Sequence, residues 1–229
     1  MSKRIAVGNH DPGPLAAGTG PGPEFSILGV EAVRHAAAPS LAFAAQVTEP
    51  SGRDVYTIAL RAQIMIEPAR RTYDDETRAR LVELFGPPAR WAATTTSFIW
   101  LETDVLIPAF TGATTFRIPI ACTYDLELAA VKYFYSVPDG EVPLQFNFTG
   151  TIFYRGANGA IQIAQVPWDR AADFRMPVQV WKEMVAHYYP HSGWARLHAD
   201  TLTALTRRRA ERGLPSLDAT VAELLKEAR

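Results

Sequence analysis

Several long segments of this chain alternate strictly between apolar and polar residues. The alternation is clearest from Tyr56 to Ile66, where every second residue belongs to one apolar series. Successive side chains of a strand point to opposite faces of the sheet, so a period of two predicts a strand with one buried face. The same pattern, with interruptions, marks residues 25–33, 41–47, 97–107, 116–128, 144–154 and 161–163.

Turn residues between these segments predict how the strands are joined. The run Pro50-Ser-Gly52 separates two strand segments, and its composition favours a tight turn. We therefore expect residues 41–47 and 56–66 to form a β-hairpin. The run Gly156-Ala-Asn-Gly159 should close another hairpin onto residues 161–163.

The alternation changes phase after Leu128. Apolar residues stand at even positions from Phe116 to Leu128 and at odd positions from Ala129 to Tyr135. No turn residue marks the change, so we interpret it as a β-bulge or bend, with strand structure continuing on both sides.

Other stretches have the spacing of amphipathic helices. Residues 74–85 carry an apolar face and acidic residues in the first turn, and Gly86 followed by Pro87 should end the helix. Three further helical segments follow in the C-terminal third: from Pro177 to just before Pro190, from Asp200 to about Arg212, and from Ser216 onward.

The order of these elements predicts the fold class. Strands first and helices last indicate an α+β, mainly β fold: an antiparallel β-sandwich-like core of about seven or eight strands, one inserted helix and a C-terminal helical cap at about residues 177–228. Residues 1–24 are rich in glycine and proline and should form a disordered tail. The remaining 25–229 fit a single domain.

The charge and hydropathy of the chain argue against several classes of protein. The formal net charge is −1, so no bulk field draws the chain to nucleic acid, and the basic run Arg207-Arg-Arg209 is expected on a solvated helix face. No apolar run reaches the roughly 18 residues of a membrane span, and no secretory signal is present. Cys122 is the only cysteine, which suits a reducing compartment, and we expect a cytoplasmic protein.

No motif indicates a catalytic centre or a cofactor site. Cys122 falls in the apolar phase of its strand and should be a core side chain rather than a nucleophile. His187, His191 and His198 are weak candidates for a metal site, because an i, i+4 pair on a helix can chelate a divalent ion. Pro190 should end the helix before His191, so we expect these rings to be exposed or hydrogen-bonded singly and assign no metal ligand.

Two pairs of acidic residues lie on strand segments. Glu102 and Asp104 share one strand face, and Asp125 and Glu127 share a face of the next strand. Residues two apart on a strand are roughly 7 Å apart, so the four could serve acid/base chemistry or a hard cation if the strands pair. The alternation, however, predicts that both pairs face solvent.

Apolar side chains carry more information about function. From residue 131 to residue 154 aromatic residues occupy both phases, so either the C-terminal helices or a partner should cover the second face. Phe98 and Trp100 stand in phase with Glu102 and Asp104, and an aromatic centre with a charged rim is typical of a protein contact surface. The predicted binding residues are Phe98, Trp100, Glu102, Asp104, Asp125 and Glu127.

The C-terminal segment resembles the ending of a known family. The resemblance is carried by Tyr189-Pro-His-Ser-Gly-Trp194, Asp200-Thr-Leu202, Gly213-Leu-Pro215 and the residues from Ala222 to Leu225. The family is an uncharacterised bacterial domain-of-unknown-function family, often encoded near uptake NiFe hydrogenases, and the likeness spans about residues 25–226. It implies an accessory role in hydrogenase expression, assembly or partnering, and it implies no catalytic residues. A weaker similarity of architecture links the chain to SecB-type export chaperones.

Three hypotheses about function follow. The first is a non-enzymatic accessory or assembly protein, hydrogenase-associated, that contacts a protein partner or a second copy of itself. The second is a chaperone-like or apolar-ligand-binding protein, which needs a groove between sheet and helices. The third is a metal-dependent enzyme built on the histidines or the acidic strand residues. We expect no cofactor, no nucleic acid and no membrane among the binding partners.

Overall fold

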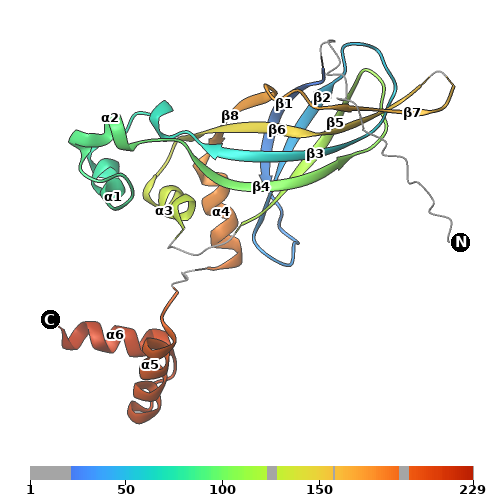
Figure 1. The fold of residues 1–229 in the computed structure, drawn as a ribbon. Helices are drawn as coiled ribbons and strands as arrows, with labels where there is room; N and C mark the ends of the chain where they lie inside the picture. Colours follow the sequence, from blue (N-terminus) through green and yellow to red (C-terminus); the bar gives the residue numbers. More distant parts are fainter. Residues whose placement is uncertain (1–21, 123–127, 157, 191–195, 229) are drawn as a thin grey trace, which may run out of the picture.

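The computed structural model describes residues 22–122, 128–156, 158–190 and 196–228, and within them eight strands form two antiparallel sheets (Figure 1). This confirms the predicted mixed, β-rich architecture. The strands are β1 (Glu24–Ala32), β2 (Ser40–Thr48), β3 (Val55–Ile66), β4 (Phe98–Ile107), β5 (Ala113–Ala121), β6 (Glu141–Arg155), β7 (Ile161–Gln165) and β8 (Ala171–Pro177). The helices are α1 (Asp75–Phe85), α2 (Trp91–Thr94), α3 (Ala129–Ser136), α4 (Val178–Tyr188), α5 (Ala199–Arg212) and α6 (Leu217–Glu227).

The two sheets differ in size and touch along their edges. The smaller has the order β1-β2-β5, and the larger has the order β4-β3-β6-β7 with β8 also paired to β6. β6 is long enough to hold both neighbours, β8 along residues 141–147 and β7 along residues 151–155. At one edge, Thr103 Oγ1 of β4 donates to Pro119 O of β5 at 3.2 Å, and at the other β1 runs beside β8.

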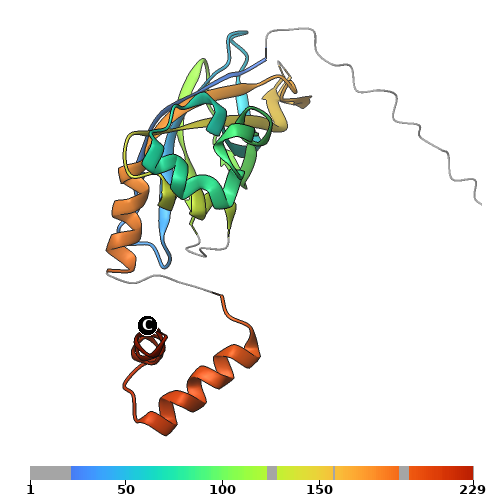
Figure 2. The ribbon, with the colours of Figure 1, turned by 90° about the vertical axis from the view of Figure 1, so that its left-hand side faces the viewer.

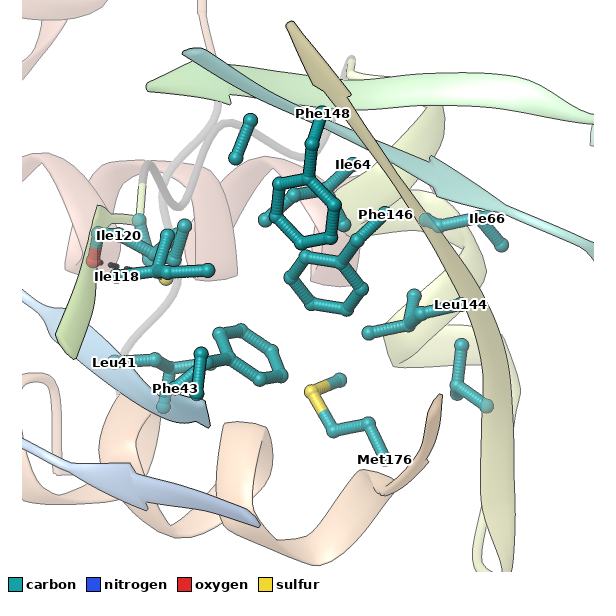
Figure 3. Close-up of a cluster of buried hydrophobic side chains, with 14 of the residues drawn as sticks. Leu41, Phe43, Ile64, Ile66, Ile118, Ile120, Leu144, Phe146, Phe148 and Met176 are labelled. Carbon is teal, nitrogen blue, oxygen red and sulfur yellow. Dashed lines mark hydrogen bonds between the residues drawn. The ribbon is translucent and has the colours of Figure 1, made fainter. Parts of the chain in front are cut away.

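The core lies between the two sheets. Phe43 and Ile118 from the smaller sheet face Phe146 and Phe148 from the larger one, and all four are fully buried (Figure 3). The rings of Phe43 and Phe146 meet edge to face with centroids 5.0 Å apart. Each such side chain contributes roughly 1.5–3 kcal/mol through burial, so this layer supplies much of the drive to fold.

The predicted hairpin of residues 41–47 and 56–66 is wrong. β2 belongs to the smaller sheet and β3 to the larger, so the link between them crosses the sandwich. Glu49, only 2% exposed, anchors this link: its carboxylate accepts hydrogen bonds from Ser51 N at 3.1 Å and from Tyr154 Oη of β6 at 2.6 Å. Burial alone would raise the pKa of Glu49, but these bonds, with the charge of Arg53, hold it below the ordinary value. A turn composition shows that the chain turns, not which sheet it enters.

The predicted strand beyond Leu128 is also wrong, because residues 129–136 form the helix α3. Its buried residues are Ala130, Val131, Tyr133 and Phe134, and this grouping places one face of a helix toward the core. Six of the eight residues from Ala129 to Ser136 are apolar or aromatic, the exceptions being Lys132 and Ser136, so the local pattern fits a period of two as well as 3.6.

Helices cover one end of the larger sheet. The predicted helix at residues 74–85 is present as α1, where Asp74 caps the N-terminus by accepting from Thr77 N at 2.7 Å. Two further helices, α2 and α3, lie near it, where β3 ends and β4 begins (Figure 1). α4 packs against β1, β2 and β8, and Trp181 from this helix is 2% exposed.

The last two helices pack mainly on each other (Figures 1 and 2). Ser216 caps α6 by accepting from Ala219 N at 3.0 Å, and Gly213 ends α5 at a φ of 62°, a left-handed conformation that favours glycine. Four ion pairs join the two helices and involve Arg208, Arg212, Glu223 and Glu227. None of the helices in the described ranges combines the length and the hydropathy needed to cross a bilayer.

Candidate protein-contact surface

The outer face of the five-stranded sheet carries a polar strip across β4, β3 and β6. Arg61 pairs in register with Asp104, and Gln63 pairs with Glu102. Arg61 Nε and Nη2 donate to the two carboxylate oxygens of Asp104 at 2.8 and 3.2 Å, and Gln63 Nε2 donates to Glu102 Oε1 at 2.7 Å. The hydrogen bond from Arg61 lowers the pKa of Asp104. The strip therefore presents charged groups already held in a fixed geometry.

An open hollow of about 530 Å³ adjoins this strip. Its lining includes Arg61 and Asp104 together with Leu106, whose side chain is 71% exposed. Ala59 and Gly150 also line the hollow, and their small size leaves room between the longer side chains. Gly150 has a φ of 148°, and a Cβ there would lie 2.1 Å from the carbonyl oxygen of Ala59. Only glycine lets β6 approach β3 this closely.

Further exposed apolar side chains belong to β3 and β7, at the end of the larger sheet that no described helix covers (Figure 1). Ile163 of β7 pairs in register with Phe153 of β6 and is 57% exposed. Tyr56 is displaced by an irregularity in β3 and is 47% exposed, with the guanidinium carbon of Arg155 4.9 Å from its ring centre. Large apolar side chains left exposed together are typical of interaction surfaces.

The sequence prediction placed Phe98, Trp100, Glu102 and Asp104 on one face, and the structure separates them. The register of β4 against β3 shifts between Ile99 and Leu101, which is a β-bulge. Before the bulge, Phe98 and Trp100 pack against the core, whereas after it Glu102 and Asp104 face solvent. The aromatic centre and its charged rim are thus on opposite sides of the sheet.

The second predicted acidic pair, Asp125 and Glu127, lies outside the described residues. The two strands whose pairing would have brought four carboxylates together are β4 and β5, and they belong to different sheets. Glu102 and Asp104 instead lie opposite Gln63 and Arg61 of β3, whose side chains donate hydrogen bonds to the two carboxylates.

The three histidines do not gather into a site that the structure describes. His187 lies on α4 beside a hollow of about 240 Å³ that Arg34 and Glu183 also line, and its Nε2 is 3.2 Å from Arg34 O. His198 precedes α5, and His191 lies outside the described residues. Among the residues that can be placed, no three histidine, cysteine, aspartate or glutamate side chains could hold a metal ion.

Two further predictions concern the interior. Cys122 is buried as predicted, and burial raises the pKa of its thiol to about 12, which keeps the thiolate scarce at neutral pH. The chaperone-like hypothesis needs a groove between sheet and helices. Where β4 meets the helices, aromatic side chains are in contact: the Phe134 ring centre lies 4.8 Å from that of Trp100 and 5.2 Å from that of Trp181. That place offers side-chain packing rather than room for a ligand.

Sequence reasoning missed Arg61, Leu106 and Ile163 as members of the surface. A signal for Leu106 was present, because it shares its phase with two acidic residues and so belongs to the solvent face. Arg61 stands in the polar phase of the clearest strand pattern, but its pairing with Asp104 depends on strand order. The exposure of Ile163 depends on β7 being an edge, which no local pattern reveals.

Comparisons with known proteins give a family but no activity. A family model described as "Family of unknown function (DUF6084)" matches residues 21–229. No curated protein matches the chain. Among solved structures, a protein assigned to the late embryogenesis abundant (LEA) class is 13% identical with a TM-score of 0.34, covering 69% of this chain and 71% of that one. A β-glucosidase from Kluyveromyces marxianus is 8% identical with a TM-score of 0.26, covering 68% of this chain and 14% of that one. With sequence identities and TM-scores this low, these similarities say nothing about the function of this chain.

Proposed function

We propose, starting from the fact that this chain belongs to the DUF6084 family of unknown function, that it is a non-enzymatic accessory protein that binds a protein partner. The binding surface is the outer face of the five-stranded sheet. The observation that carries the proposal is that Leu106, 71% exposed, lines an open hollow together with the Arg61–Asp104 pair.

The shape and chemistry of this face favour a macromolecular partner. Small ligands are usually held in enclosed pockets that bury most of their surface, whereas this hollow is open and crosses three strands. Arginine is enriched among residues that dominate protein interfaces, and Arg61 is already oriented by its carboxylate partner. Ordering this side chain on binding therefore costs less than ordering a free arginine would.

The finer proposal concerns the identity of the partner. We infer that it is an uptake NiFe hydrogenase or one of its assembly proteins, and that the contact is made in the cytoplasm. Support comes from the C-terminal residues that resemble the hydrogenase-associated family, from Tyr189 to Leu225, and from the single cysteine of the chain.

The test is co-purification from a host cell that expresses an uptake hydrogenase. We expect the tagged wild-type chain to retain one discrete partner, detected as hydrogenase by immunoblot, and Leu106→Asp to lose it because a carboxylate then enters the apolar contact. Tyr135→Asp is the matched control, because Tyr135 is 60% exposed on α3, away from the strip.

The outcomes distinguish the proposed accessory role from the proposed identity of the partner. A discrete partner that is lost with Leu106→Asp but is not hydrogenase would keep the accessory role and discard the hydrogenase. Equal retention by both variants would remove the outer face as the binding surface. A stoichiometric metal in the purified chain, found by elemental analysis, would favour the competing hypothesis of a metal-dependent enzyme.

A further inference from the structure

Among the described strands, β7 is an edge strand of the larger sheet. It pairs with β6 on one side, and two backbone bonds at its ends fix the phase of that ladder: Val166 N donates to Gly150 O at 2.9 Å, and Gly156 N donates to Ala160 O at 2.8 Å. Antiparallel ladders bond at alternate residues, so positions 162 and 164 bond to β6. Positions 161, 163 and 165 therefore turn their N–H and C=O groups away from the sheet, where no other described strand takes them up.

This edge lacks the features that usually protect one. Natural edge strands carry charges, proline or bulges that discourage pairing with another chain. The five residues from Ile161 to Gln165 include no charged residue and no proline, and their register against β6 is unbroken. Ile161 and Ile163 are 47% and 57% exposed. The edge is therefore open to addition of a further strand.

The spacing of the outward groups fits a second copy of the same strand. In an antiparallel pair with a two-fold axis at Ile163, Ile163 faces the Ile163 of the second copy, and Ile161 faces the second copy's Gln165. Each of the three outward positions then forms a hydrogen-bonded pair. On the outer face, Ile163 and its register partner Phe153 join the same two residues of the second copy in one apolar row.

The absence of charged residues on β7 also favours a second copy of this chain as the added strand. A residue on a two-fold axis meets its own copy, so a charge at that position would repel itself. β7 has none. A charged peptide would find no oppositely charged side chain on β7. An identical uncharged strand needs none.

We propose that two copies of this chain associate through β7, antiparallel and centred on Ile163, to make one continuous sheet. The axis is perpendicular to the sheet, so both Arg61–Asp104 strips lie on the same side and the dimer offers two contact surfaces to a partner. The role of the two contact surfaces rests on the proposed function. The dimer itself is measured without any partner, so its absence and the absence of partner binding can be told apart.

The test is sedimentation velocity of the full chain and of charge variants on the axis. We expect the wild type to sediment at about twice the chain mass of 25.2 kDa at a concentration of about 100 μM. Ile163→Lys and Ile163→Glu should each raise the dissociation constant at least tenfold, and an equimolar mixture of the two should recover a dimer through opposite charges on the axis. Thr115→Lys, on the edge strand β5, is the control and should sediment like the wild type.

Recovery in the mixture excludes misfolding as the cause of monomeric single variants. A monomeric wild type, or dimeric single variants, would overturn the proposal. So would a mixture that stays monomeric while the wild type is a dimer, because the axis would then lie elsewhere. Gly22 lies against Pro167, just beyond the end of β7. Dimers that form only after deletion of residues 1–21 would assign the edge to that segment of the same chain, which would also contradict the proposal.

Discussion

The two ends of the five-stranded sheet use similar side chains for different purposes. At the helix-covered end, Phe98 and Trp100 of β4 pack with Tyr133 and Phe134 of α3, with ring centres 6.1 Å apart for Phe98 and Tyr133 and 4.8 Å apart for Trp100 and Phe134. At the open end, Leu106 of the same strand is 71% exposed. Whether an apolar residue of β4 packs in the core or lies in solvent therefore depends on the face of the sheet on which it stands and on the helices at that end.

A single irregularity in β4 separates the two roles. The bulge near Trp100 turns the residues before it toward the core and the acidic residues after it toward solvent. Substitutions at one residue in each end, and in the link between the two sheets, should therefore differ in their effect on stability.

The largest expected effect is at the covered end. Trp100→Ala should lower the free energy of unfolding by about 3 kcal/mol, because it removes a large ring that packs between Phe43 and Phe134. Urea denaturation followed by far-UV circular dichroism measures this. A change below about 0.5 kcal/mol, the range of ordinary surface substitutions, would show that Trp100 is a surface residue and that the comparison is wrong.

A smaller effect is expected where the chain crosses between sheets. Tyr154→Phe should cost about 1–2 kcal/mol, because the buried carboxylate of Glu49 loses one of its hydrogen-bond donors. The same urea titration measures it. Tyr56→Phe, on an exposed ring of β3, is the control and should unfold like the wild type.

The same carboxylate predicts a dependence of stability on pH. The folded pKa of Glu49 is below its ordinary value of 4.5, so the ionised form stabilises the fold. This contribution is complete above the ordinary pKa and is lost as the pH falls through the folded pKa. Glu49→Gln should therefore be less stable than the wild type at neutral pH, and the difference should shrink in acid. A difference that grows as the pH falls would contradict the assignment.

The smallest effect on stability is expected at the open end. Leu106→Asp should change the free energy of unfolding by less than about 0.5 kcal/mol, because the side chain is mostly in water before and after the change. Thermal unfolding of this variant beside Trp100→Ala makes the contrast between the two ends direct. A loss of stability as large as that of Trp100→Ala would mean that Leu106 supports the fold.

The sequence predicted the parts of the fold that depend on local periodicity. β3 and β4 were recognisable because their alternation is long, and α1 because its apolar spacing, its acidic first turn and its terminal glycine agree. The solvent exposure of Glu102 and Asp104 followed from the same alternation. These features need no knowledge of distant residues.

What sequence could not supply depends on contacts between distant segments. The turn at residues 49–53 was recognised, but its route into the second sheet depends on Tyr154, more than a hundred residues later. The bulge near Trp100 has no local signal, and without it Trp100 seemed to share a face with Glu102. Most residues of α3 are apolar, so its sequence is compatible with both a helix and a strand. The helix is favoured by packing of Tyr133 in the core, which the local sequence does not reveal.

We propose that the outer face of the larger sheet, rather than another exposed apolar surface, contacts a protein partner. Site-specific photo-crosslinking in host cells can distinguish these surfaces, with the photoreactive residue at position 106, at position 135 on α3, or at position 225 on α6, where Leu225 is 63% exposed. We predict one discrete heterologous adduct from position 106 and none from the other two. Adducts from position 225 or 135 with none from position 106 would contradict the account.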